Sequence, residues 1–223
     1  MVIIDFKLDD ALYKKAENFS NFRERCKKYL SEAGKNWDKF TIVKHDSIIG
    51  YLTEYAFSKA LERKFPDIKV SSWEKQFDIP SIIEIVDNNI HTEKNHDLVV
   101  EYFYDKWDLK LERNDQIVYC DVKTALTKKE PRNNWNFLYP VVQANKLGKD
   151  LATLVYYIVG DLKDLRSFKQ LILVGFTDYD KITNCKVIKA GEKTRFGTIS
   201  QIDNYITELG RDYSLDFDKL FKN

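Results

Sequence analysis

Apolar side chains recur at the three- and four-residue spacing of amphipathic helices in several stretches of the chain. Asp46 or Ser47 is placed to cap the second of these stretches, and Pro66 ends it. Gly210 stops the last one. The pattern predicts helices over residues 8–33, 46–65, 141–147 and 200–209.

Other stretches show the two-residue period or the continuous apolar run of β-strands. Residues 151–159 and 171–176 are apolar throughout, as expected for strands covered on both faces. Residues 66–97 are expected to be helix or loop, and residues 161–168 a loop or a short helical turn. The predicted strands are 98–103, 107–111, 117–123, 151–159 and 171–176, with an edge strand at 185–189. This order of elements predicts an α/β protein, an α/β/α core with a central mixed β-sheet.

The amino-acid composition is that of a globular protein. The 223 residues are 43% hydrophobic and 14% aromatic, which predicts one globular domain. We expect an N-terminal helical region (1–45), a core (46–176), and a C-terminal strand and helix (177–223) that pack on the core. No run of about 18 apolar residues and no signal-peptide pattern is visible, so we expect no membrane partner.

The cysteines indicate the cellular compartment, and the net charge bears on nucleic-acid binding. Cys26, Cys120 and Cys185 are odd in number and far apart, which favours a reducing compartment, the cytoplasm, and argues against structural zinc. The net charge of +1 gives no overall electrostatic case for nucleic acid. A nucleic-acid interface would therefore be a local basic patch.

Residues 107–123 carry the strongest chemical signal, because they predict a β-hairpin with acidic positions on one face. If Asn114 and Asp115 form a two-residue turn, residues whose numbers sum to 229 pair across it. Asp108 then lies opposite Asp121, with Lys123 two residues further on the same face. Cross-strand neighbours have Cβ atoms about 5 Å apart, so two carboxylates and an ammonium meet at one spot.

Such a group suits metal-dependent hydrolysis of a phosphodiester. Mg²⁺ prefers hard oxygen ligands, often one or two carboxylates with waters and phosphate oxygens. A competing register pairs Asp97 with the Asp108-Leu-Lys110 triplet, and a further alternative is an edge hairpin whose polar face only meets water. Acid-x-Lys triplets occur six times, starting at Asp5, Glu62, Asp67, Asp108, Asp121 and Asp161. Asp121 differs from the others because it lies in an apolar strand aligned with an acid.

Asp108 followed by Asp121-Val122-Lys123 resembles the PD-(D/E)xK nuclease signature, and the continuation to Glu130 resembles type II restriction endonucleases. Trp107 stands where the signature has proline. The resemblance implies a restriction-endonuclease-like fold and a Mg²⁺-dependent endonuclease acting on double-stranded DNA as a homodimer. Mn²⁺ is expected to substitute for Mg²⁺, and Ca²⁺ to support binding without cleavage.

The resemblance also implies roles for single residues. The catalytic candidates are Asp108, Asp121, Lys123 and Glu54. The metal-binding candidates are Asp108, Asp121, Val122 and Glu54. Glu54 comes from the helix before the hairpin. Gln143 and Lys146 are expected to face the site. The loop after the hairpin offers DNA contacts through Lys128, Lys129, Arg132, Asn133, Asn134 and Trp135. His91 and His96 are expected to be loop residues, since their spacing does not suit a zinc site.

Two other classes of function stay open. The chain fits a repair, recombination or phage nuclease of the same fold, or a non-catalytic nucleic-acid-binding domain whose acids have become structural. Metal-dependent cleavage at a defined sequence would distinguish the restriction enzyme from both.

Overall fold

A computed structural model describes residues 1–33, 43–148, 150–194, 197–217 and 221 of the chain. Within them the helices are α1 (Asp10–Glu32), α2 (Lys44–Lys64), the short 3-10 helix η1 (Trp73–Gln76), α3 (Ile79–Asp87), α4 (Glu93–Phe103), α5 (Val141–Leu147), α6 (Tyr179–Thr183) and α7 (Leu209–Asp212). The strands are β1 (Val2–Ile4), β2 (Lys69–Ser72), β3 (Leu109–Arg113), β4 (Gln116–Thr127), β5 (Asn136–Pro140), β6 (Leu151–Asp161), β7 (Asp164–Thr177), β8 (Val187–Ile188) and β9 (Asn204–Glu208). The chain is an α/β protein, as the sequence predicts.

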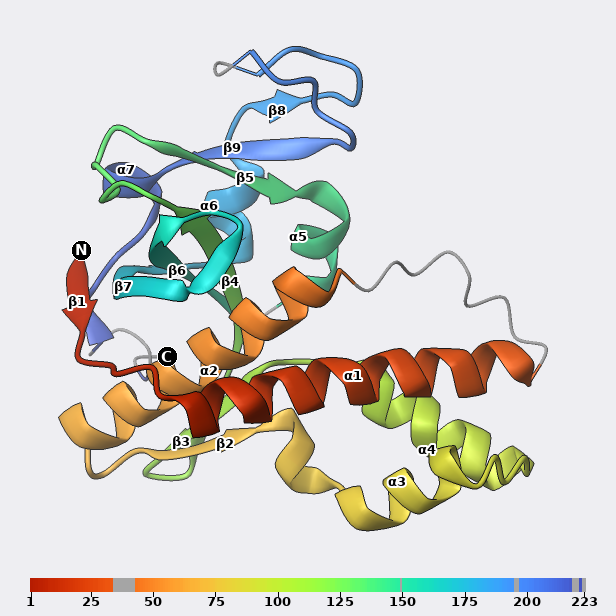
Figure 1. Ribbon diagram of the computed structural model, residues 1–223. Helices are drawn as coiled ribbons and strands as arrows, with labels where there is room; N and C mark the ends of the chain where they lie inside the picture. The colour runs from red at the N-terminus through yellow and green to blue at the C-terminus, as the bar shows by residue number, and fades with distance from the viewer. Residues whose placement is uncertain (34–42, 149, 195–196, 218–220, 222–223) are drawn as a thin grey trace.

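The main sheet has the strand order β1-β7-β6-β4-β3-β2 (Figure 1). Its neighbours are antiparallel except β4 and β6, which run parallel, so the predicted mixed sheet is confirmed. Parallel neighbours need a crossover connection. Here the crossover consists of β5 and α5, and α5 lies beside the end of the β3–β4 hairpin, with which it lines one cavity.

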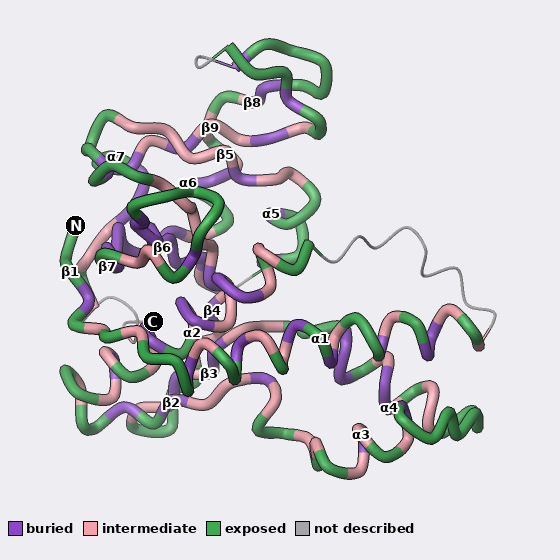
Figure 2. Tube along the Cα trace, viewed as in Figure 1, coloured by how far each residue is buried: buried purple, intermediate pink, exposed green. Residues whose placement is uncertain are grey.

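Helices α1 and α2 cover one face of the main sheet. Their apolar side chains form one core cluster with residues of all six strands, including Leu52 and Phe57 of α2 and Leu111, Val122 and Tyr157 of the sheet. Residues 152–159 of β6 are all buried, and this stretch is visible in Figure 2. The predicted burial of this strand on both faces is confirmed.

The opposite face of the main sheet is covered by a smaller sheet, β5-β9-β8, together with the short helices α5, α6 and α7. Leu154, Tyr156 and Val174 of the main sheet pack there against Leu209 and Tyr213. The two faces therefore differ, since long helices cover one and a small sheet with single helical turns covers the other.

Helices α3 and α4 lie beside α1, and here the sequence prediction is wrong. Residues 98–103 form the end of helix α4 rather than a strand, and His96 lies on this helix rather than in a loop. Thr92 caps the helix by accepting a hydrogen bond from the Asn95 N–H at 3.2 Å. The buried residues that hold the three helices together are Phe22, Cys26, Tyr29, Leu30, Ile82, Val86, Val99, Tyr102 and Phe103.

The predicted helix over residues 200–209 is also wrong. Residues 204–208 form strand β9, which pairs with β5 on one side and β8 on the other. The Ser200 hydroxyl, which would have capped a helix, donates instead to the Ile202 carbonyl oxygen at 2.7 Å in a turn. Cross-strand pairing with β5 therefore decides the conformation of this segment.

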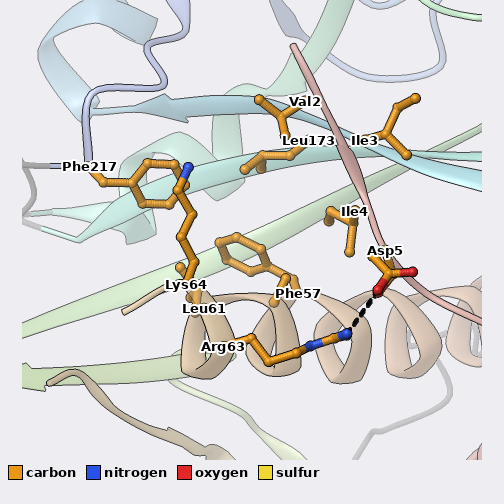
Figure 3. Close-up of a pocket in the computed structure, with 11 residues that line it drawn as sticks. Val2, Ile3, Ile4, Asp5, Phe57, Leu61, Arg63, Lys64, Leu173 and Phe217 are labelled. Carbon is orange, nitrogen blue, oxygen red and sulfur yellow. Dashed lines mark hydrogen bonds and ion pairs between the residues drawn. The ribbon is translucent and has the colours of Figure 1, made fainter. Parts of the chain in front are cut away.

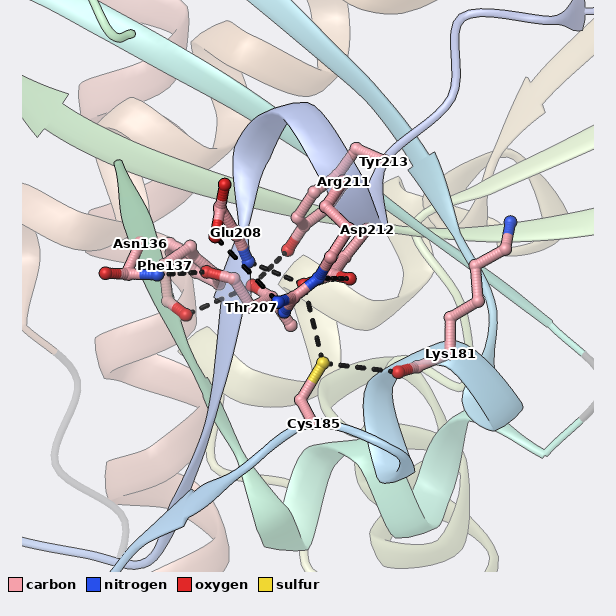
Figure 4. A network of polar contacts seen from close by, with 9 residues as sticks. All are labelled: Asn136, Phe137, Lys181, Cys185, Thr207, Glu208, Arg211, Asp212 and Tyr213. Carbon is pink, nitrogen blue, oxygen red and sulfur yellow. Dashed lines mark hydrogen bonds and ion pairs between the residues drawn. The ribbon is translucent and has the colours of Figure 1, made fainter. Parts of the chain in front are cut away.

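A polar network fixes the turn that follows β9 (Figure 4). The buried Asp212 carboxylate accepts hydrogen bonds from the Arg211 side chain at 2.7 Å and from the Glu208 N–H at 2.6 Å. Although burial acts to raise it, these donors hold the pKa of Asp212 below its ordinary value. The network keeps α7 against the main sheet, where Tyr213 packs.

Four smaller differences from the sequence prediction concern boundaries and short strands. Residues 161–168 are mostly strand, because β6 and β7 meet in a tight hairpin rather than a loop or helical turn. Helix α2 begins before Asp46, after Val43, and has no side-chain cap. Strand β2 lies in the segment expected to be helix or loop, and β5 extends from the end of the loop after the hairpin.

Candidate active site

The β3–β4 hairpin has the register that the sequence predicts. Asn114 and Asp115 form the two-residue turn with φ values of 48° and 63°, the left-handed conformation that a type I′ turn requires. Leu109 pairs with Cys120, so paired residues do sum to 229. Asp108 accordingly lies beside Asp121 at the open end of the hairpin.

Asp108 lies where the ladder between the two strands ends. Its N–H donates to the Cys120 carbonyl oxygen at 3.0 Å, and its own carboxylate accepts from the Val122 N–H. A side-chain oxygen thus takes the place of the main-chain acceptor that β3 no longer supplies. Burial, and then the charge of Asp121, raise the pKa of Asp108 to about 8.

Asp121 is held by two donors, one for each carboxylate oxygen. Oδ1 accepts from Lys123 Nζ at 2.6 Å, and Oδ2 accepts from the Tyr139 hydroxyl at 2.8 Å. Burial acts to lower the pKa of Lys123, but Asp121 and Asp108 outweigh it and raise this pKa above its ordinary value. Lys123 therefore stays protonated and is a hydrogen-bond donor rather than a base.

Glu54 approaches this group from α2. Burial raises its pKa well above the ordinary range, and the next cause is the charge of Asp108. Glu54 lines a neighbouring cavity of about 250 Å³ with Glu74 and Leu109, and does not line the cavity onto which Asp108 opens. The structure thus brings Glu54 into electrostatic contact with Asp108 but places it behind the site.

The cavity at the site has a volume of about 250 Å³ and is strongly polar. It is lined by Asp105, Lys106, Asp108, Asp121, Lys123, Gln143, Lys146, Leu147 and Asp150. Gln143 and Lys146 of α5 face it, as predicted. Asp105, Asp150 and the Tyr139 hydroxyl were not anticipated. Asp150 directly precedes β6, and only the parallel register with β4 reveals that it lies near Asp121.

The loop proposed to contact DNA lies apart from this cavity, whose lining among the described residues includes none of its six candidates. Five of them are exposed: Lys128, Lys129, Arg132, Asn133 and Asn134. Trp135 is half-buried and packs edge-to-face on Tyr156, with ring centroids 6.2 Å apart. The Asn133 carbonyl oxygen accepts from the Gly210 N–H at 2.8 Å, which ties the loop to α7.

The acidic side chains that line the cavity are the groups that would hold a divalent cation. Within the described ranges no three acidic, histidine or cysteine side chains lie close enough together to enclose a metal ion. Two carboxylates, Asp108 and Asp121, nevertheless supply the hard oxygen ligands that suffice for Mg²⁺ when waters and phosphate complete its shell. The Val122 side chain is buried, so any contribution from Val122 is through its main chain. The donor set therefore fits Mg²⁺.

An apolar cavity and a pair of histidines lie elsewhere among the described residues. A cavity of about 310 Å³ at the β1 edge is lined mainly by apolar side chains such as Phe57 and Phe217, with the Arg63–Asp5 ion pair at its rim (Figure 3). His91 and His96 contact each other, Nδ1 to Nε2 at 2.9 Å, beside the ring of Tyr29. None of the helices in the described ranges combines the length and the apolar character required to cross a membrane.

Comparisons of the chain with protein-family models, with curated protein sequences and with solved structures give no match. A functional assignment must therefore rest on the geometry of the site.

Proposed function

We propose that the protein is a Mg²⁺-dependent endonuclease that hydrolyses phosphodiester bonds in double-stranded DNA, and in particular a sequence-specific type II restriction enzyme. One observation carries the proposal: the hairpin register places Asp108 beside Asp121, and Lys123 Nζ lies 2.6 Å from Asp121 Oδ1. Two carboxylates and a protonated lysine at the rim of one polar cavity are the groups that this reaction needs.

Each side chain has a distinct part in the proposal. Asp108 and Asp121 hold the cation, which would stabilise charge developing on phosphorus and lower the pKa of a bound water. Lys123 donates a hydrogen bond to the attacking water and offsets negative charge on the phosphate. Glu54 lies behind Asp108, and its negative charge, where the carboxyl group is ionised, would favour a divalent cation in front of Asp108.

The arrangement of elements supports the restriction-endonuclease-like fold as part of this proposal. The helix α2, the acidic hairpin, the crossover helix α5 and the parallel strand β6 follow one another in the order that the resemblance implies. Gln143 on α5 agrees with the polar residue expected on the helix after the lysine strand. We also propose that the enzyme acts as a homodimer, because a restriction enzyme must cut two strands. Its proposed location is the cytoplasm.

The test is to incubate the purified protein with unmethylated genomic DNA and Mg²⁺ and to sequence the ends that form. Recurrent ends at one short sequence are expected. Mn²⁺ should replace Mg²⁺, and Ca²⁺ should allow binding without cleavage.

Lys123→Ala is the matched control for this assay. Its fold and its DNA affinity in Ca²⁺ should be retained while cleavage is lost, because Lys123 acts on the nucleophile and not on the duplex. Ends without a common sequence would indicate a repair, recombination or phage nuclease. Cleavage by Lys123→Ala at the wild-type rate would contradict the proposed site, and sequence binding without any cleavage would identify a DNA-binding domain.

A further inference from the structure

Tyr139 donates a hydrogen bond to the acidic group from a different sheet. It belongs to β5, in the smaller sheet, and its hydroxyl lies 2.8 Å from Asp121 Oδ2. The other oxygen of Asp121 is occupied by Lys123 Nζ at 2.6 Å. A rotation of the Asp121 carboxylate would break both hydrogen bonds, so this pair of donors fixes its orientation.

The phenol ring has no freedom to move away. Tyr139 is fully buried, and its ring packs in a cluster with Ala144, Leu147, Ala152 and Ile182. Its main chain pairs with Tyr205 of β9. The position of the hydroxyl is therefore set by the packing of the smaller sheet on the main sheet, independently of any ligand.

We infer that Tyr139 is a positioning residue, whose hydroxyl orients Asp121 to bind the divalent cation. This inference rests on the proposed function. A carboxylate has about four acceptor positions, and Lys123 and Tyr139 use two of them. The remaining lone pairs of Asp121 then point in fixed directions, which is what a metal ligand requires. Groups that orient metal ligands in this way typically change metal affinity or activity by about 10–100-fold when they are removed.

Tyr139→Phe tests the inference, because it keeps the buried ring and removes only the hydroxyl. The matched control is Tyr157→Phe. Tyr157 is equally buried, and its hydroxyl donates to the Leu165 carbonyl oxygen at 3.1 Å in the core cluster under α1 and α2. Both variants lose one buried phenol hydrogen bond, but only Tyr139→Phe loses one to Asp121.

The measurement is Mn²⁺ binding followed by electron paramagnetic resonance, without DNA, alongside the Mg²⁺ dependence of DNA cleavage. Tyr139→Phe should weaken Mn²⁺ binding by about 10–100-fold and raise the Mg²⁺ concentration needed for cleavage. Tyr157→Phe should leave both unchanged. In an Asp121→Asn background, Tyr139→Phe should have no further effect on Mn²⁺ binding, since its hydroxyl acts through that carboxylate.

The outcomes separate this inference from the proposed function. Wild-type Mn²⁺ affinity in Tyr139→Phe would overturn the role of Tyr139 and leave a cleaving enzyme intact. Mn²⁺ binding that depends on Tyr139 in a protein that cuts no DNA would uphold the positioning role and overturn the nuclease. A wild-type protein that binds no Mn²⁺ would overturn both.

A probe that keeps the hydroxyl covers the case in which Tyr139→Phe does not fold. 3-Fluorotyrosine placed at position 139 should show a fluorine resonance that shifts with Mg²⁺ and broadens with Mn²⁺, while the same probe at position 157 should not. A resonance at position 139 that is insensitive to both ions would overturn the inference.

Discussion

The raised pKa of Asp108 predicts that the candidate site destabilises the metal-free fold as the pH rises. The pKa of Asp108 in the folded protein is about 8, against an ordinary value of 3.8, because the carboxyl group is buried and lies beside Asp121. Between these two values the folded state holds a proton that the unfolded state has released. The free energy of unfolding therefore falls as the pH rises through this window.

The magnitude follows from linkage. One proton of difference changes the free energy of unfolding by about 1.4 kcal/mol per pH unit. Asp108→Asn removes this proton and still offers an oxygen to the Val122 N–H. From about pH 5 to about pH 7, the wild type should lose up to about 3 kcal/mol relative to Asp108→Asn. Burial, the largest cause of the raised pKa of Glu54, is common to both proteins, whereas Asp108→Asn removes the second cause, the charge of Asp108, so any change at Glu54 adds to the difference in the same direction.

Urea unfolding in EDTA at a series of pH values measures this difference. Asp180→Asn, which makes the same aspartate-to-amide change at an exposed position on α6 outside the cavity, is the control whose pH dependence is compared with that of Asp108→Asn. Adding Mg²⁺ should reduce the pH dependence of the wild type, because the cation favours the ionised carboxylate. Parallel pH dependences of the wild type and Asp108→Asn in EDTA would refute the reasoning.

Two further predictions concern the register of the site and the loop after it. Asp121→Asn should reduce cleavage by orders of magnitude, since it replaces an anionic ligand with an amide. Asp97→Asn, on α4, should reduce cleavage much less. If Asp97→Asn reduces cleavage more than Asp121→Asn, the competing register is favoured. Lys129→Ala should weaken binding to all DNA sequences equally and flatten the plot of log affinity against log salt by about one unit, measured in Ca²⁺. Asn134→Ala should instead cost about 1–3 kcal/mol of specificity at one base pair and leave the slope of log affinity against log salt unchanged. If Lys129→Ala and the wild type have equal slopes, this loop faces solvent.

The hairpin could be predicted from the sequence because local chemistry determines it. Asn114 and Asp115 tolerate the left-handed conformation of the turn, and a two-residue turn leaves one register for the strands. That register alone brings Asp108 to Asp121. The long helices were predicted for the same reason, since their spacing extends over many residues.

The errors fall where distant partners decide the structure. Residues 98–103 and 204–208 are short segments whose pattern suits a helix or a strand, and packing against α1 or pairing with β5 selects between them. Tyr139 carries no local sign that its hydroxyl meets Asp121, because that contact depends on how the smaller sheet packs. Asp150 likewise reaches the site only through the parallel pairing of β4 with β6.

The same charges explain both the lower stability of the metal-free fold at higher pH and the affinity for the cation that we propose the site binds. Burial raises the pKa of Asp108, Glu54 and Asp150, and in each case a neighbouring carboxylate raises it further. The positive charge of Lys123 offsets part of this negative potential. The pKa of Lys123 is itself raised, because the negative charge of the carboxylates outweighs the effect of burial. At an effective dielectric constant of about 20, a unit charge 4 Å away contributes about 4 kcal/mol, so a divalent cation at the cavity would outweigh the repulsion between these groups. The same carboxyl groups that are hard to ionise in the metal-free protein thus favour a divalent cation, and the pH dependence of stability and the affinity for Mg²⁺ should change together when Asp108 is replaced.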